Sequence, residues 1–194
     1  MAAVELHRKR MRRHEMPGNI RFITFSCQRR LPLLRNRDIA RLFTAALARA
    51  RTDHGLLLYA WVVMPEHIHM LCRPPEGAPL DRLLLRIKMS VAKRVLERWK
   101  HLNAPILRMV LDATGRPRFW QKGGGFDRNV RSADEFCREI GYIHHNPVER
   151  GLVAKPEEWR WSSIHWWMGN REGQLPCDPP PGQPEAWASW TGYM

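Results

Sequence analysis

The chain has 194 residues, of which 32 are Lys or Arg and 19 are Asp or Glu, so its formal net charge is +13. That length suits one domain with extensions. The excess of positive charge predicts a polyanionic partner, with nucleic acid expected and a membrane surface as the alternative. No apolar run approaches the roughly 20 residues of a transmembrane helix, and the first residues lack the apolar core of a secretory signal. The four cysteines are widely spaced and match neither a zinc pattern nor a disulfide framework, so we expect a cytoplasmic protein without a membrane anchor.

The first part of the chain alternates between strand-like and helix-like hydrophobic spacing. Residues 1–17 precede it as a basic arm, which is either a phosphate-binding segment or a solvated tail. Asn36 and Gly55 are the expected start and stop signals of the first helix. The expected strands are residues 21–27, 56–64 and 67–73, and the expected helices are residues 38–53 and 80–100.

A short strand is expected at residues 118–121, after an irregular stretch. The resulting order β-α-β-β-α-β predicts an α+β fold, a ferredoxin-like or RRM-like sandwich in which two helices cover one face of an antiparallel sheet. The three glycines at residues 123–125 form either a flexible loop or a close backbone approach to a phosphate. They do not match a nucleotide-binding loop, because no Gly-Lys-Ser/Thr sequence ends them.

Two histidines, His67 and His69, flank one apolar residue in the expected third strand. Successive strand side chains point to opposite faces, so the two histidines emerge together on one face and Ile68 on the other. Two imidazoles held side by side on a sheet are a ready pair of metal ligands, although a solvated strand face gives the same pattern. A metal site therefore requires a further ligand from elsewhere in the chain.

A separate helix is expected beyond the sandwich. It begins at Ser132 and Glu135, which have the spacing of a capping box, and it is expected to end before Pro147. Its apolar residues Phe136, Ile140 and Ile143 predict a buried stripe.

Tyr142 and Asn146 are four residues apart on this helix and therefore lie on the same side of it. Two interpretations are open at this stage. The pair can reach a cleft beside the histidines, or Tyr142 can pack at the helix edge while Asn146 caps the helix end. His144 and His145 are expected to lie at the surface, although as nearby histidines they leave the choice of metal ligands open.

Three segments in this order and spacing resemble the REP-associated tyrosine transposases, which belong to the bacterial HUH single-tyrosine transposases and are related to the insertion-sequence-200-like transposases. The likeness covers roughly residues 18–165, and residues 120–129 also resemble that group. The three segments are Pro65-Glu66-His67-Ile68-His69, Tyr142-Ile143-His144-His145-Asn146-Pro147 and Trp159-Arg160-Trp161-Ser162-Ser163.

The resemblance implies a function for each candidate residue. His67 and His69 correspond to the paired metal ligands, Tyr142 to the nucleophile and Asn146 to the third ligand. The implied cofactor is Mg²⁺ or Mn²⁺, with no nucleotide cofactor. The implied substrate is single-stranded DNA near a hairpin, cleaved and rejoined through a 5′-phosphotyrosine. Members of the group are monomers or homodimers, so either state is expected here, in the bacterial cytoplasm with the nucleoid.

Residues 166–194 are rich in Pro, Gly and Trp and are expected to wrap over the domain as an extension. We expect Trp159 and Trp161 to pack against the domain, whereas Trp187 and Trp190 either pack or stack on unpaired bases. Two other functions are open: a non-catalytic nucleic-acid-binding protein on the same fold, and a hydrolase that activates water at the histidine pair. Of the three functions, the transposase alone requires Tyr142.

Overall fold

The computed structural model describes residues 18–123, 125–170 and 175–182 of the chain. Within these residues, four antiparallel strands form one sheet in the order β2-β3-β1-β4. The strands are β1 (Ile20–Ser26), β2 (Leu57–Val63), β3 (His67–Arg73) and β4 (Phe126–Val130). The long helices are α1 (Arg37–His54), α2 (Leu80–His101) and α4 (Ala133–Glu149). Short helical segments are η1 (Gln28–Arg30), η2 (Leu33–Arg35), α3 (Ile106–Met109), η3 (Pro156–Glu158) and α5 (Ile164–Trp167).

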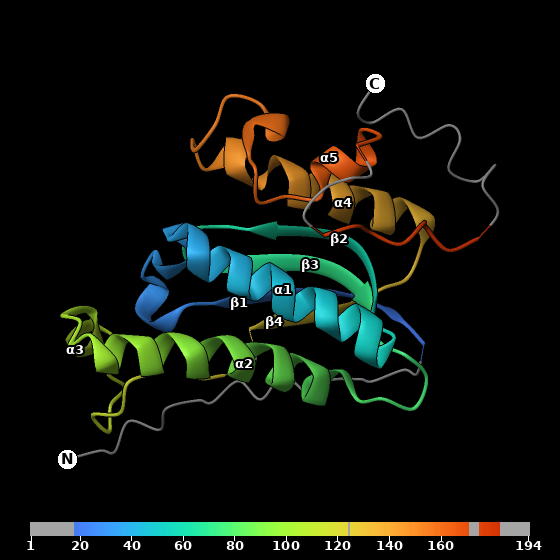
Figure 1. Ribbon diagram of the computed structural model, residues 1–194. Helices are drawn as coiled ribbons and strands as arrows, with labels where there is room; N and C mark the ends of the chain where they lie inside the picture. The colour runs from blue at the N-terminus through green and yellow to red at the C-terminus, as the bar shows by residue number, and fades with distance from the viewer. Residues whose placement is uncertain (1–17, 124, 171–174, 183–194) are drawn as a thin grey trace, which may run out of the picture.

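This strand order is that of a ferredoxin-like sandwich, and the predicted α+β fold is confirmed. Figure 1 shows α1 and α2 on one side of the sheet and α4 on the other. β3 and β1 are the two central strands, so the residues at the start of β3 are flanked by a partner on each side.

Local signals in the sequence explain where α1 begins and ends. The side chain of Asn36 accepts hydrogen bonds from the backbone N–H groups of Asp38 and Ile39, at 3.0 and 3.3 Å, and so satisfies two donors of the first turn. Gly55 follows the helix with a φ of +66°, which a residue without Cβ adopts easily. Both predicted signals are confirmed.

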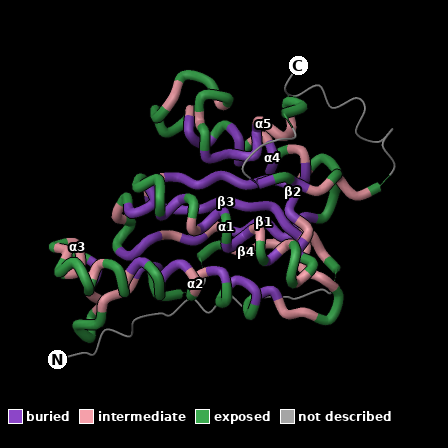
Figure 2. Tube along the Cα trace, in the orientation of Figure 1, coloured by how far each residue is buried: buried purple, intermediate pink, exposed green. Residues whose placement is uncertain are grey.

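The main apolar core lies between the sheet and the α1/α2 layer. β1 contributes Ile23 and Phe25 to it, and β3 contributes Ile68 and Met70, all of them almost fully buried. In Figure 2, buried residues run along β1, β2 and β3 and recur along the helices. Because side chains alternate along a strand, the neighbours of these residues point to the opposite face, toward α4.

The fourth strand is Phe126–Val130, and the prediction of a strand at residues 118–121 is wrong. That segment makes one isolated bridge, between Trp120 and Cys27. Trp120 is anchored in the core instead: its ring packs on Phe25 with centroids 5.0 Å apart, and its indole nitrogen donates to the carbonyl of Lys88 at 2.8 Å. The apolar character of the segment therefore reflects core packing of its side chains.

β4 is polar, which concealed it in the sequence. Its residue Asp127 forms an ion pair with Arg21 of β1 at 2.7 Å, and both side chains are almost fully buried. A charge that is paired across two strands can occupy a sheet at a modest net cost, whereas an unpaired charge cannot. The partners are 106 residues apart in the chain, so local periodicity does not reveal the pair.

α4 begins as predicted but ends later than predicted. The hydroxyl of Ser132 accepts from the backbone N–H of Glu135 at 3.1 Å, whereas the Glu135 carboxylate accepts from the N–H of Arg131 at 2.7 Å. The helix continues through Pro147 to Glu149, so the prediction that Pro147 ends it is wrong. A proline this close to the C-terminus removes one intrahelical donor, and the carbonyl of Pro147 still accepts from Leu152 at 2.9 Å.

The segment after α4 pairs with the outer edge of β2. Ser162 forms a bridge with Val62, and the backbone N–H of Val63 donates to the carbonyl of Trp161 at 2.8 Å. The indole nitrogen of Trp159 donates to the carbonyl of Val63 at 3.0 Å. The predicted packing roles of Trp159 and Trp161 are confirmed, and this edge of the sheet is covered.

Residues 175–182 run along the same side of the domain. The Asp178 carboxylate accepts from the guanidinium of Arg51 in α1 at 2.7 Å and from the backbone N–H of Leu58 in β2 at 2.7 Å. Trp187, Trp190 and the basic arm lie outside the described residues, so their predicted roles stay predictions. None of the helices in the described part of the chain combines the length and apolar composition needed to cross a bilayer.

Candidate active site

The two histidines of β3 face α4, on the side of the sheet opposite the main core. In the register of β3 with β1, His67 lies opposite Ser26 and His69 opposite Thr24. The Nε2 atoms of the two histidines are 2.8 Å apart, and the side chains are 3% and 5% exposed. The strand alternation that was predicted from the sequence therefore brings both rings to one point.

Each imidazole is held through its other nitrogen. Nδ1 of His67 lies 3.0 Å from a carboxylate oxygen of Glu66, and Nδ1 of His69 lies 2.7 Å from the hydroxyl of Thr24. An ionised carboxylate only accepts, so Nδ1 of His67 carries the proton and its Nε2 presents a lone pair. The Glu66 carboxylate is itself fixed by Arg150 at 3.0 Å. Such partners orient metal-binding histidines in many proteins.

Burial favours the neutral form of both histidines. It lowers the pKa of His69 to about 3, with a smaller contribution from the neighbouring His67. It also lowers the pKa of His67, against the opposing effect of Glu66. Neutral imidazole is the form that binds a metal ion.

α4 places Tyr142 and Asn146 over this pair. The ring of Tyr142 lies 5.3 Å from the ring of His69, edge to face, and the side chain is 42% exposed. Asn146 is 5% exposed, and its Oδ1 is buried without a hydrogen-bond partner among the described residues. Tyr142, Asn146 and both histidines line one pocket of about 660 Å³. The structure thus brings together all four residues that the sequence singled out.

The donor set of this pocket fits a divalent ion. Neighbouring nitrogen ligands of an octahedral ion lie about 3 Å apart when each bond is about 2.1 Å, close to the separation of the two Nε2 atoms. The described residues contain no metal-binding cluster of three or more His, Cys, Asp and Glu side chains. The Oδ1 atom of Asn146, which is buried and has no hydrogen-bond partner among the described residues, could serve as a further ligand beside the two imidazoles.

The rim of the pocket is basic. Arg30, Arg128, Arg138 and Arg150 line it, together with Glu139 and Glu149. Arg128 forms ion pairs with Glu135 and Glu139 and lies over the ring of Phe22, 5.6 Å from its centroid. Guanidinium groups at the mouth of a pocket attract phosphate and can hold it through paired hydrogen bonds.

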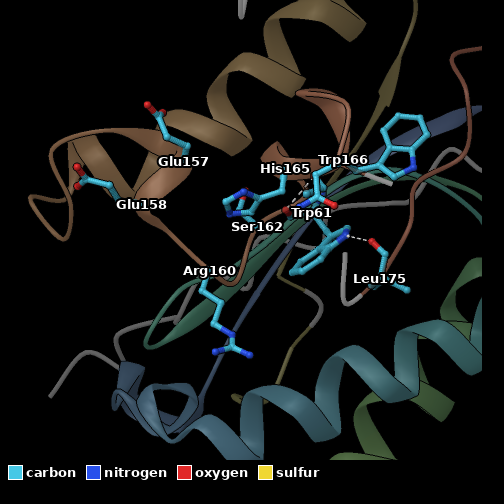
Figure 3. Close-up of a pocket in the computed structure, with 10 residues that line it drawn as sticks. Trp61, Glu157, Glu158, Arg160, Ser162, His165, Trp166 and Leu175 are labelled. Atoms are coloured by element: carbon cyan, nitrogen blue, oxygen red, sulfur yellow. Dashed lines mark hydrogen bonds between the residues drawn. The ribbon is translucent and has the colours of Figure 1, made fainter. Parts of the chain in front are cut away.

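A second cavity, of about 370 Å³, lies on another part of the domain, between β2, α5 and the segments next to them. Figure 3 shows its lining, in which the indole nitrogen of Trp61 donates to the carbonyl of Leu175 at 3.2 Å. None of the residues predicted as nucleophile or ligand lines it. The four residues singled out in the sequence therefore line the histidine pocket and not this cavity.

Three features of the site were not predicted from the sequence. Glu66 and Thr24 hold the two histidines, and adjacency to His67 was the available signal for Glu66. Thr24 is 45 residues away from His69, and only the strand register connects them. His144 was expected at the surface, but it is fully buried and its Nε2 lies 2.8 Å from the hydroxyl of Ser163. That contact links α4 to the segment along β2.

The structure has a ferredoxin-like sheet with two histidines on a central strand, and α4, which carries Tyr142, lies over them. The resemblance to single-tyrosine transposases implies this arrangement. The family model described as "Transposase IS200 like" matches residues 19–123, which is more than half of the chain. The chain belongs to the IS200-like transposase family. The matched range contains β1 to β3 and ends before β4 and α4.

Two further comparisons extend beyond that range. The chain is 24% identical, over 155 residues, to a REP-associated tyrosine transposase of Escherichia coli (strain K12), covering 79% of this chain and 81% of that protein. It also matches a solved structure of a REP-associated tyrosine transposase bound to a REP hairpin, with a TM-score of 0.63 and 23% identity, covering 88% of this chain and 90% of that one. The resemblance inferred from the sequence motifs is confirmed, and so is the fold.

Proposed function

We propose that this protein cleaves and rejoins single-stranded DNA beside a hairpin, with Tyr142 as the nucleophile. The observation that carries the proposal is the meeting of Tyr142, from α4, with the His67/His69 pair, from β3, in one basic pocket. A structural relative was solved with a REP hairpin, which supports hairpin DNA as the substrate class. Family membership supports the same reaction class.

The reaction is a transesterification. The phenolic oxygen of Tyr142 attacks phosphorus, a new P–O bond forms to the tyrosine, and the bond from phosphorus to the 3′ oxygen breaks. The phenol loses one proton and the departing 3′ hydroxyl gains one, so no proton is consumed overall. A 5′-phosphotyrosine results, and attack on it by a 3′ hydroxyl rejoins a strand. The energy of the phosphodiester is retained in the covalent bond, so no nucleotide cofactor is required.

Residues around the phenol assist in binding and orientation. The arginines at the rim attract the phosphate and reduce its repulsion of an incoming nucleophile. His67, His69 and Asn146 would hold Mg²⁺ or Mn²⁺, which when bound supplies Lewis-acid polarisation of the phosphate. Because two of the three ligands are nitrogen atoms, we expect Mn²⁺ to support cleavage better than Mg²⁺ does. α4 places the ring of Tyr142 5.3 Å from the ring of His69.

The test uses a labelled hairpin oligonucleotide with single-stranded flanks and Mn²⁺. The wild-type protein is expected to form a protein–DNA adduct that survives denaturing electrophoresis, and Tyr142→Phe is expected to form none while still binding the hairpin. Tyr59→Phe is a matched control, because the Tyr59 hydroxyl is buried without a partner among the described residues and lies outside the pocket lining. An adduct formed by the Tyr142→Phe protein would refute the proposal.

A further inference from the structure

A groove of about 550 Å³ lies between the outer face of α2 and residues 116–122, outside the site described above. Leu85 and Met89 are exposed on α2 at 58% and 56%, and both line the groove. They are four residues apart and so lie on one side of the helix. Large apolar side chains that are exposed next to each other on one side of a helix are typical of a surface that binds a ligand or a partner.

The border of the groove is strongly basic. Lys93, Lys100, Arg116 and Lys122 line it and are exposed, and Glu97 is the single acidic residue in the lining. None of these four side chains forms an ion pair within the described residues, so their charges face the groove and the solvent. The positive charge of the border favours a polyanion as the ligand. The apolar floor of the groove, formed by Leu85 and Met89, favours a polyanion that also exposes apolar faces.

The wall formed by residues 116–122 is held rigidly in place. The backbone N–H of Arg118 donates to the carbonyl of Val110 at 2.9 Å, and that of Gln121 donates to the carbonyl of Ser26 at 3.0 Å. The indole of Trp120 is hydrogen-bonded to the backbone carbonyl of Lys88 in α2, and this bond connects residues 116–122 to α2, the other wall of the groove. A groove with fixed walls binds a flexible strand with less loss of conformational entropy.

The wall also connects the groove to the active-site pocket. Ser26, the backbone partner of Gln121, lines that pocket and lies opposite His67 in the sheet. Neighbouring strands are about 4.8 Å apart, so the backbone of Gln121 lies roughly 10 Å from that of His67. The pocket lies on the α4 face of the sheet and the groove beside α2 on the other face, so a DNA strand that leaves the pocket reaches the groove by passing around this corner.

We propose that the groove between α2 and residues 116–122 binds the single-stranded DNA that flanks the hairpin. The assignment rests on the proposed function, because the bound strand is the continuation of the strand that Tyr142 cleaves. The lysines and Arg116 contact phosphates, and unpaired bases lie against Leu85 and Met89. A duplex cannot use that floor, because its bases are stacked inside the helix and only phosphates reach the protein.

The first test measures the affinity for an oligothymidylate of about ten nucleotides by fluorescence anisotropy. The buffer contains EDTA, so the result depends on neither the metal nor Tyr142 and is separate from the cleavage assay. We expect the double variant Lys93→Gln/Lys100→Gln to bind about ten-fold more weakly, with the slope of log affinity against log salt reduced by about 1.4 for two lost contacts.

The matched control is Arg94→Gln/Arg98→Gln, which removes the same charge from exposed positions of the same helix outside the groove. Its affinity is expected to fall less than about two-fold, because general electrostatic attraction is weak and screened at physiological salt. Equal losses in the two double variants, or no loss in either, would overturn the proposal. A loss for blunt duplex DNA as large as that for the oligothymidylate would overturn the assignment to single strands.

The second test asks whether unpaired bases contact the apolar floor of the groove. Met89→Ser is expected to weaken the oligothymidylate about three-fold, since it removes an apolar contact, and to leave the affinity for an abasic strand of the same length unchanged. Met89 is exposed, so the substitution does not disturb the core. An equal effect on both strands, or none on the oligothymidylate, would show that bases do not contact the floor and would overturn that part of the proposal.

Discussion

The two faces of the sheet are built from the same strands and carry different chemistry. Toward α1 and α2, Ile68 and Met70 of β3 point into a closed apolar core. Toward α4, His67 and His69 of the same strand point into a pocket of about 660 Å³. Alternation along one strand therefore helps to fix the histidines, because Ile68, between the two imidazoles, and Met70, after His69, are packed in the core.

α4 is divided in a comparable way. Phe136, Ile140 and Ile143 are buried against the sheet in a smaller apolar cluster, while Tyr142 projects toward the histidines. The apolar stripe of α4 therefore packs against the sheet, and the phenol of Tyr142 projects from the edge of that stripe. A catalytic group that acts by its position needs rigid support next to the open site, because displacing it by about 1 Å can lower the rate by about two orders of magnitude.

The largest expected effect concerns the pocket face. We expect His69→Ala to reduce the rate of DNA cleavage at least about a thousand-fold, because metal-assisted catalysis contributes several kcal/mol to the barrier. Hairpin affinity should change little. The rate is measured by single-turnover cleavage in Mn²⁺, with His145→Ala, an exposed histidine on α4, as the control. Cleavage retained by the His69→Ala protein would remove the histidine pair from the mechanism.

On the core face, Phe25→Ala is expected to lower the free energy of unfolding by about 3–5 kcal/mol, because it leaves a cavity beside Phe43 and Trp120. Urea denaturation measures the change. If the two faces are as distinct as the structure indicates, the cleavage rate of the folded fraction should stay near that of the wild type. A loss of cleavage greater than the loss of folded protein would contradict the separation.

Thr24 is next to Phe25 in the chain and points to the other face, so its substitution should have the opposite profile. Thr24→Val removes the hydroxyl that lies 2.7 Å from Nδ1 of His69 and is expected to weaken Mn²⁺ binding about 10- to 100-fold. The free energy of unfolding should change by less than about 1 kcal/mol. Titration calorimetry with Mn²⁺ provides the measurement, and Thr24→Ser, which keeps the hydroxyl, should restore affinity.

The smallest effect concerns His144, which connects α4 to Ser163. Burial lowers the pKa of His144 to about 3, so between about pH 6.5 and 3 the unfolded chain binds a proton there that the folded protein does not. Stability from this residue is therefore present above pH 6.5 and is lost as the pH falls. We expect the decrease in unfolding free energy between pH 7 and 5 to be up to about 2 kcal/mol smaller in His144→Gln.

Urea denaturation of the wild-type and His144→Gln proteins in EDTA at both pH values measures this difference. His165→Gln, which replaces a histidine outside full burial, is the control and should leave the decrease unchanged. If the unfolding free energy of His144→Gln decreases between pH 7 and 5 as much as that of the wild type, the other buried histidines account for the decrease.

Sequence periodicity predicted the parts of the molecule that follow local rules. The first three strands, α1, α2 and the start of α4 depend on alternation, helical spacing and caps, which the chain carries within a few residues. β4 was missed because it is polar, and the buried side chain of its residue Asp127 is accommodated through an ion pair with the distant Arg21. His144 was misplaced because its partner, Ser163, comes from a segment whose path along β2 is set by tertiary contacts.

The candidate residues of the site were predicted, whereas their supporting contacts were not. The spacing His-x-His and the Tyr142–Asn146 interval are local patterns, so they are visible in the sequence. Thr24 and Arg150 act through strand register and through the carboxylate of Glu66, and neither relation has a local signature. The part of the site that sequence reasoning missed is therefore the part that depends on how distant segments meet.

The most direct test of the central claim is to identify the residue to which DNA becomes attached. The wild-type protein is incubated with a flanked hairpin and Mn²⁺, the product is digested with protease and nuclease, and the peptides are analysed by mass spectrometry. The account predicts a nucleotide phosphate on the peptide that contains Tyr142, linked through the 5′ end of the DNA. Attachment to Tyr59 or Tyr193 in place of Tyr142, or cleavage without any attached peptide, would contradict it.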